Sequence, residues 1–341
     1  MKSYTLWAIT LIAVSTLAGC AGKPNKPDWM MGDTPRYQEA EFLIGHGDGV
    51  TSEEAKDRAR TDLAKIFSVS VIAESSDVSV FKGGESGHDQ GQERTETNIS
   101  RTLNTRTDQI MQGVRIAEMW HDPQTQRHYA LAALRRTSAA MSLRQEISRL
   151  DDATAHNVER ARNASDLFDK IGAARQALDA QMERAAYQKS LKVVDRTGQG
   201  MPSSWTVERL RADLDDLLKR ARIGVRVGDD ATGRLSQSVA GGLAAAGMAE
   251  TRENPDYLVD ARLDLADLGR REGWHWVTGT LQVQLSERAS ERIRGTKRWS
   301  IKASAQDSAL ARQRALDQVD QILKKELGDA VMGFVVNKHG D

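Results

Sequence analysis

The first pattern along the 341-residue chain is a positive charge, an apolar run and a stretch of small residues. Lys2 precedes residues 6–14, which are apolar except for Thr10. This order is typical of a secretory signal peptide. The apolar run is shorter than the roughly 20 residues that a membrane-spanning helix needs. We therefore assign residues 1–19 to a signal peptide.

The next segment, residues 20–40, is rich in proline. It holds three of the six prolines in the chain. Such a composition predicts an extended tether between the N-terminus and the first folded domain. Trp29 and Tyr37 are the aromatic residues of this segment, and we expect them to pack on that domain.

Residues 41–136 predict a small α/β domain. Residues 42–49 form a strand that ends in a Gly-rich turn, and a helix follows. Thr51 and Glu54 have the spacing of a capping box at the start of that helix. Its apolar face is expected to consist of residues at helical spacing: Ala55, Ala59, Leu63 and Ile66.

Further strands are expected in this domain after the helix. In residues 68–73, Val69 and Val71 alternate with Ser70 and Ile72, as in a strand. Residues 83–94 predict a Gly-rich loop, and residues 96–107 predict a polar edge strand after it. A hairpin follows, with its turn at Asp122 and Pro123. The predicted order is β-α-β-β-β.

The middle of the chain, residues 137–222, predicts helices. Between residues 137 and 196 there is no proline and one glycine, Gly172. Apolar residues recur there at helical spacing, and a helical hairpin that turns near residues 163–165 explains them better than one helix about 90 Å long. This apolar stripe could bind a partner helix, but packing within the hairpin is the simpler interpretation. Ser203 or Ser204 is expected to cap a third helix.

Residues 223–336 predict a second small α/β domain with the order β-α-β-β-β-α. The expected strands alternate apolar and polar positions, and the closing helix carries Ala311, Ala315, Val319, Ile322 and Leu323 at helical spacing. The fold class is therefore α+β, with two small α/β sandwich domains joined by a helical hairpin.

The composition adds two restrictions. The 48 basic residues equal the 48 acidic residues in number, so no basic field exists to attract nucleic acid. Cys20 is the only cysteine, so the chain cannot form an intramolecular disulfide.

The position of Cys20 explains why one cysteine is present. Leu17, Ala18, Gly19 and Cys20 resemble the lipobox of bacterial lipoproteins. The resemblance implies that Cys20 is acylated and becomes the mature N-terminus, which anchors the protein in a membrane. Ala21 stands where an aspartate would favour the inner membrane. We therefore expect a lipid-anchored outer-membrane protein that faces the periplasm.

Four segments of the first domain resemble the LPP20-like family of bacterial outer-membrane lipoproteins. They are KPDW, FLIGHGDG, EEAKDRARTDLAKIF leading into SVSV, and IAEMWHDPQTQRHYALAAL, and the resemblance covers about residues 24–136. It implies a periplasmic α/β domain used for binding and assembly. Some members belong to structures around the flagellar motor.

No set of residues predicts catalysis. The chain has no G-x-S-x-G motif, and GHGDG at residues 45–49 lacks the spacing of a phosphate-binding loop, so we interpret its glycines as a strand-to-helix turn. His121, Asp122 and His128 flank one turn without the spacing of metal ligands. Paired carboxylates such as Asp151 and Asp152 are expected to face water. We predict no catalytic residue, no metal and no cofactor.

Trp274 and Trp276 are the best candidates for partner binding. In a strand they share the polar face, opposite Val277 and Leu281. Two tryptophans on that face suggest a platform for a partner protein or a sugar chain. The alternative is that another part of the chain covers them.

The sequence therefore predicts a non-enzymatic outer-membrane lipoprotein. The leading hypothesis is a scaffold or assembly factor that binds other proteins of an envelope structure, including a flagellum-associated one. The alternative is a regulator of a peptidoglycan synthase. Nothing in the sequence indicates an oligomeric state.

Overall fold

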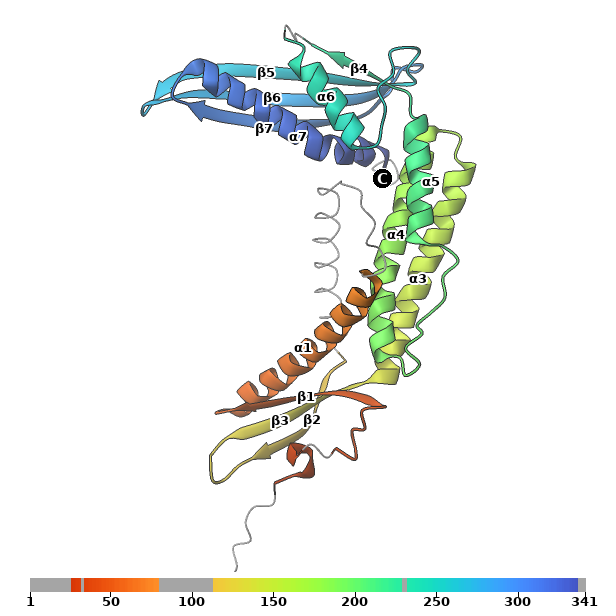
Figure 1. Cartoon of the computed structure of the whole chain (residues 1–341), viewed down its shortest axis with the longest axis vertical. Helices are drawn as coiled ribbons and strands as arrows, with labels where there is room; N and C mark the ends of the chain where they lie inside the picture. Colours follow the sequence, from red (N-terminus) through yellow and green to blue (C-terminus); the bar gives the residue numbers. More distant parts are fainter. Residues whose placement is uncertain (1–25, 32–33, 80–112, 229–231, 337–341) are drawn as a thin grey trace, which may run out of the picture. The chain divides into compact units, whose positions relative to one another are not determined.

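The computed structural model describes residues 26–31, 34–79, 113–228 and 232–336 (Figure 1). It contains helices and two separate sheets, which confirms the α+β class. The signal peptide, the lipobox with Cys20, the loop at residues 83–94 and the predicted edge strand at residues 96–107 lie outside the described residues. In the part of the chain that the structure describes, no helix is both long and apolar enough to cross a membrane.

The chain folds as two compact units. The first contains the described residues up to Leu143 together with Lys189–Gly200, and the second contains Arg144–Gln188 and the described residues from Met201 onward. The two long helices of the hairpin contribute residues to both units.

The first unit is a three-stranded antiparallel sheet with one helix on it. The strand order is β1-β3-β2. A short 3-10 helix, η1, precedes the sheet. The elements are η1 Asp28–Met31, β1 Phe42–Gly49, α1 Ser52–Ser79, β2 Arg115–His121 and β3 His128–Arg135. The predicted hairpin is confirmed, with Asp122 N donating to Arg127 O at 2.9 Å across its turn.

The predicted strand at residues 68–73 is wrong, because α1 continues through it to Ser79. Ala55, Ala59 and Leu63 are fully buried, and Phe67 and Val71 continue the same four-residue spacing into the core. Burial of one residue in four is helical spacing. Residues 69 and 71 are both valine, so the short segment also resembles a strand, but Val69 is 65% exposed. Ile66, expected in the core, is exposed instead.

The start of α1 agrees with the predicted capping box. Thr51 Oγ1 accepts a hydrogen bond from Glu54 N at 3.2 Å. Glu54 Oε2 accepts from Val50 N at 2.8 Å, one residue before the position that a capping box normally uses. Both bonds satisfy backbone donors that have no partner inside the helix.

The glycines of residues 45–49 were expected to form a turn, and this interpretation is wrong. Gly45 and Gly47 lie within β1, paired with Ala132 and Ala130 of β3. A Cβ atom on either glycine would collide with the backbone of α1. The glycines therefore allow the helix to approach the sheet more closely than any side chain would.

We expect Gly47→Ala to destabilise the first unit by about 1–3 kcal/mol or more, because its methyl group would collide with backbone at Ala55 and Ala59. Chemical denaturation followed by hydrogen exchange in β1 and β3 would measure this loss. Gly333→Ala is the control, since a methyl group there meets nothing within 4 Å. Equal stability of the two variants would show that α1 does not depend on this close approach.

The hairpin consists of α3 Arg136–Asn163 and α4 Leu167–Val194, and α5 Val207–Arg220 follows. The break at residues 164–166 confirms the predicted turn. Thr206, rather than Ser203 or Ser204, caps α5, since its side chain accepts from Arg209 N at 3.2 Å. Much of the apolar stripe is buried within the chain, including Ile147. Packing within the hairpin does not account for all of it, because Phe168 and Ile171 belong to the core of the second unit, where the ring of Phe168 meets that of Tyr257 at 4.1 Å.

The second unit carries a four-stranded sheet of order β4-β5-β6-β7 in which only β4 and β5 are parallel. Helices α6 and α7 cover one face of it (Figure 1). The order confirms the predicted β-α-β-β-β-α. The elements are β4 Ile223–Val227, α6 Arg234–Ala245, β5 Tyr257–Arg271, β6 Trp274–Glu287, β7 Ile293–Ala305 and α7 Ser308–Val336.

The core of this unit lies between the sheet and helices α6 and α7, and buried residues of α4 and α5 continue it. Val259, Leu281 and Ile301 are fully buried on three neighbouring strands. The predicted face of α7 is confirmed in the main: Ala311, Ala315, Val319 and Leu323 are buried. Trp299 Nε1 donates to Glu326 Oε2 at 2.8 Å, which adds a polar link between β7 and α7. Since α6 and α7 both lie on this face, neither of them covers the opposite face of the sheet.

Candidate functional site

The segment that follows the lipobox packs on the first sheet. We call residues 26–31 and 34–41 the anchor segment. The ring of Trp29 stacks on His46, with 6.3 Å between ring centroids, and Tyr37 meets Phe42 edge-on at 5.4 Å. Tyr37 Oη also donates to Glu118 Oε1 at 3.3 Å. The expected packing of Trp29 and Tyr37 is thus confirmed, and these residues lie against the sheet rather than extending away from it.

Arg136 fixes the end of the anchor segment. Its Nε donates to Glu39 O at 2.8 Å, and its Nη1 donates to Val193 O at 2.7 Å. Arg136 N also donates to Glu41 O at 2.9 Å. Burial lowers the pKa of the Arg136 guanidinium, although arginine stays charged at physiological pH. One side chain therefore links the anchor segment to the last turns of α4.

A groove of about 390 Å³ opens between the anchor segment and the sheet. We call it the aromatic groove; its lining residues are Trp29, Met30, His46, Gly47, Asp48 and Tyr129. The sequence did not reveal it, because three separate segments contribute. A signal was nevertheless present, since Asp48 and Tyr129 are direct partners across β1 and β3.

An ion pair forms one side of this region. Arg127 Nε donates to Asp48 Oδ2 at 3.1 Å, and Arg127 Nη2 also contacts that oxygen. The hydrogen bond to Asp48 raises the pKa of Arg127. Both side chains are partly exposed, at 47% for Asp48 and 39% for Arg127. The pair is neutral overall and keeps access to solvent, so the groove offers hydrogen-bonding groups without net charge from this pair.

The structure places Trp274 and Trp276 as the alternation predicted. Val277, Leu281 and Val283 are buried on the helix side of β6. The other side of the sheet we call the open face; on β6 and β7 it consists of Trp276, Thr278, Thr280, Gln282, Gln284, Arg298, Ser300 and Lys302. Trp274 is 43% exposed at the start of β6.

The open face combines a cation–π contact with amide and hydroxyl groups. Lys302 Nζ lies 5.0 Å from the centre of the Trp276 ring, a distance at which ammonium groups are attracted to the ring. Arg298 Nε donates to Gln282 Oε1 at 2.8 Å. The exposed hydroxyl of Thr280 lies between these contacts along β6. This surface can form hydrogen bonds and stack against a partner.

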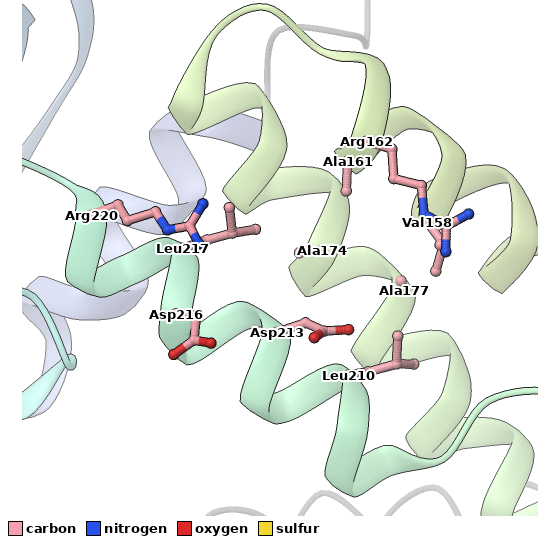
Figure 2. Close-up of a pocket in the computed structure, with 10 residues that line it drawn as sticks. All are labelled: Val158, Ala161, Arg162, Ala174, Ala177, Leu210, Asp213, Asp216, Leu217 and Arg220. Atoms are coloured by element: carbon pink, nitrogen blue, oxygen red, sulfur yellow. The ribbon is translucent and has the colours of Figure 1, made fainter.

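A second hollow, of about 260 Å³, lies among α3, α4 and α5 (Figure 2). Alanine side chains leave the space, and Leu210 and Leu217 add apolar walls. Charged side chains of both signs surround it, with Arg162 on α3 and Asp213 on α5. We call it the hairpin groove. Its mixture of charges indicates no single class of ligand.

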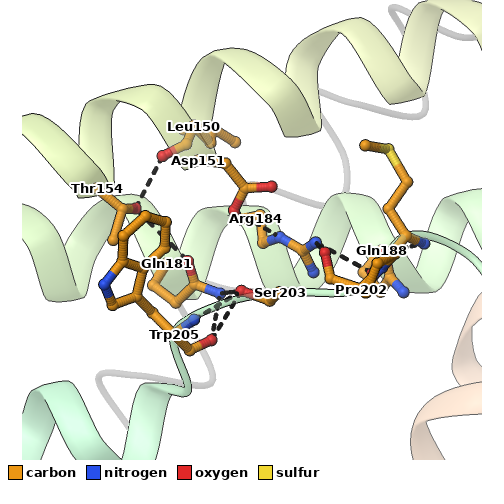
Figure 3. A network of polar contacts seen from close by, with 10 residues as sticks. Leu150, Asp151, Thr154, Gln181, Arg184, Gln188, Pro202, Ser203 and Trp205 are labelled. Atoms are coloured by element: carbon orange, nitrogen blue, oxygen red, sulfur yellow. Dashed lines mark hydrogen bonds and ion pairs between the residues drawn. The ribbon is translucent and has the colours of Figure 1, made fainter.

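Buried polar contacts hold the chain between α4 and α5 to the hairpin (Figure 3). Arg184, 4% exposed, donates from Nε to Asp151 Oδ1 at 3.0 Å and from Nη2 to Pro202 O at 2.7 Å. Gln181 Nε2 donates to Ser203 Oγ at 2.9 Å. The expectation that Asp151 simply faces water is therefore wrong. This network is structural, because its buried groups are occupied with one another.

The histidines of the first hairpin lie side by side. The rings of His121 and His128 are 4.6 Å apart between centroids. Asp122 Oδ1 instead accepts from Gln124 N at 2.8 Å, and this backbone hydrogen bond lowers the pKa of Asp122. Among the residues that the structure describes, no three histidine, cysteine or acidic side chains meet in a metal-binding group.

A comparison with known protein families found a match for the first domain. Residues 27–135 match the LPP20 lipoprotein family. The LPP20 match confirms the predicted resemblance and spans η1, α1 and all three strands of the first sheet. Together with the resemblance of residues 17–20 to a lipobox, the LPP20 match indicates a membrane-anchored lipoprotein of the cell envelope.

Solved structures show weaker likenesses. A secreted protein of Helicobacter pylori is 11% identical, with a TM-score of 0.44 over 88% of this chain and 100% of its own. A minor lipoprotein of Acinetobacter baumannii is 13% identical, with a TM-score of 0.29 over 33% of this chain and 93% of its own. No curated protein matches the chain.

Proposed function

We propose that this protein is a non-enzymatic outer-membrane lipoprotein that faces the periplasm and acts as a scaffold or assembly factor for an envelope structure. Acylation of Cys20 would supply the anchor, and Ala21 favours the outer membrane. The LPP20 match supports the lipoprotein assignment. The envelope structure could be the one around the flagellar motor, because some members of the LPP20-like family are found there.

The packing of the anchor segment carries this proposal. Trp29 stacks on His46, so few residues separate Cys20 from the folded unit. At about 3.3–3.6 Å per residue, the chain from Cys20 to Asp28 spans at most about 30 Å. A domain held this closely meets partners on the same membrane at high effective concentration. Tethering of this kind suits assembly more than it suits turnover of a diffusing substrate.

The open face is the surface that we assign to protein partners. It places Trp276 beside Lys302, surrounded by side chains that can donate and accept hydrogen bonds. Tryptophan at a protein interface often contributes a large part of the binding energy. Helices α6 and α7 lie on the other side of the sheet, which leaves this platform available to a partner of complementary shape.

Crosslinking of the tagged, lipidated protein in living cells tests the proposal. Mass spectrometry of the attached proteins should recover subunits of one envelope structure. Recovery of a peptidoglycan synthase, with a change in its activity on addition of this protein, would favour the regulator instead. Recovery of this protein alone would contradict both hypotheses.

A photo-crosslinking residue at Thr280, in the open face, is expected to capture a partner, whereas one at Leu310, on α7, is not. Trp276→Thr should lower the yield from position 280 by about tenfold or more, because tryptophans at interfaces commonly contribute 2 kcal/mol or more. Threonine keeps the preference for a strand. Equal yields from positions 280 and 310, or an unchanged yield in Trp276→Thr, would remove the open face from the interaction.

A further inference from the structure

We propose that the aromatic groove of the first unit binds one N-acetylated pyranose ring of a sugar chain. This inference does not depend on the open face or on the scaffold proposal. The volume of about 390 Å³ lies within the range of small-molecule sites, which is about 300–1,000 Å³. The groove is open at the surface, so a ring within a longer chain can enter it.

The aromatic side chains supply the surface that a sugar needs. A pyranose ring presents a face of C–H groups, which carry a slight positive charge and pack on the negative face of an aromatic ring. Trp29 and Tyr129 come from η1 and β3 and line the same hollow. His46 supports Trp29 by stacking at 6.3 Å, so the indole is held in place before a ligand arrives.

The charges of the groove argue for a neutral ligand. An aromatic pocket with a free carboxylate would suit an ammonium ion. Here Arg127 already pairs with Asp48, through two nitrogens on one oxygen. Both of these contacts use Oδ2 of Asp48, and the side chain is 47% exposed, so its other carboxylate oxygen can accept a hydrogen bond from a sugar hydroxyl. Hydrogen bonds to charged groups are the stronger kind.

Met30 suggests the substituent on the ring. It follows Trp29 in the chain, also lines the groove and adds a flexible apolar side chain to it. A thioether adapts to small apolar groups, and the methyl of an acetamido group is such a group. A plain hexose would leave this surface without a partner. The geometry therefore favours an N-acetylated sugar over an unsubstituted one.

Calorimetry with the mature, lipidated chain in detergent tests the proposal. The probes are N-acetylglucosamine oligomers, glycan strands released from peptidoglycan, lipopolysaccharide core oligosaccharide, maltooligosaccharide and tetramethylammonium. We expect binding of the N-acetylated probes at least tenfold tighter than binding of maltooligosaccharide. Whether the peptidoglycan strands or the lipopolysaccharide sugars bind more tightly identifies the source of the ring. Absence of binding by every sugar, or preference for tetramethylammonium, would overturn the proposal.

Two variants locate the binding. Trp29→Ala should weaken binding at least tenfold by removing the stacking surface. Asp48→Asn keeps the shape of the side chain, removes its charge and should also weaken binding. Val69→Ala, at an exposed position of α1 that does not line the groove, is the control and should bind as the parent does. Parent-like binding by both groove variants, with hydrogen exchange of β1 and β3 unchanged, would place the sugar elsewhere and refute the assignment.

Discussion

Arg294→Met is expected to lower the free energy of unfolding of the second unit by about 3–5 kcal/mol, the usual effect of removing one partner from a buried ion pair. The Arg294 side chain is 3% exposed. Its Nη2 lies 2.6 Å from Asp166 Oδ2, its Nη1 lies 3.5 Å from Asp169 Oδ1, and it also pairs with Glu287. Removing the guanidinium would leave three carboxylates close together without a counter-charge.

The effect is large because Asp166 joins the hairpin turn to the sheet. Asp166 Oδ1 accepts from Asp169 N at 2.9 Å, which caps α4. Tyr257 Oη of β5 donates to Asp166 Oδ2 at 3.0 Å. Burial and the neighbouring Asp166 raise the pKa of Tyr257, so its hydroxyl keeps the proton that it donates. Burial on its own would lower the pKa of Arg294, but the surrounding carboxylates raise it, so the guanidinium stays charged.

Urea denaturation and hydrogen exchange of β5 to β7 would measure the loss, because these strands belong to the affected unit. A loss of 3–5 kcal/mol corresponds to roughly a hundredfold to several-thousandfold faster exchange through global opening. Arg298 lies on the same strand but is exposed, so Arg298→Met is the matched control. The free energy of unfolding of this variant should stay within about 0.5 kcal/mol of that of the parent. If Arg294→Met is as stable as Arg298→Met, the buried network does not hold the turn to the sheet.

Periodicity predicted the second unit well, because its core follows local rules. Alternation along β6 placed Val277 and Leu281 inside and Trp276 outside, as the structure shows. The interruption near residues 163–165 predicted the hairpin turn for the same reason. In each case a regular element buries one face, so its own sequence records which face that is.

Periodicity was insufficient in the first unit. Within residues 68–73, Val69 and Val71 are two residues apart, as in a strand. The segment is nevertheless helical, because Phe67 and Val71 are buried and extend the face of α1 that begins upstream. Gly45 and Gly47 are typical of a turn in isolation. Their role depends on α1, whose backbone lies against them. Both the helix at residues 68–73 and the strand at the glycines depend on tertiary packing, which a short stretch of sequence does not show.

The two sites of most interest depend on residues far apart in the sequence. The aromatic groove joins Trp29 to Tyr129, and the buried network joins Asp166 to Arg294. No spacing rule connects such pairs, since sheet pairing and helix docking bring them together. By contrast, the lipobox is a continuous motif. Its prediction therefore needs no tertiary contact, and it leads to the second of the two largest effects.

Cys20→Ala is expected to abolish lipidation and to remove the protein from the outer-membrane fraction. Two or three acyl chains hold a protein firmly because each buried methylene contributes about 0.8 kcal/mol. Among the described residues no helix could replace this anchor by crossing the membrane. Fractionation of cells, with metabolic labelling by a fatty acid, would measure both effects. The unprocessed precursor should accumulate without label.

Two neighbouring substitutions separate anchoring from sorting. Ala21→Ser leaves the cysteine and should behave as the parent does. Ala21→Asp should keep the label but shift the protein toward the inner membrane, since an aspartate at this position favours retention there. If Cys20→Ala is found in the outer-membrane fraction to the same extent as the parent, lipid anchoring is refuted. Labelled Ala21→Asp in the outer membrane would instead leave the anchor intact and refute only the sorting argument that rests on residue 21.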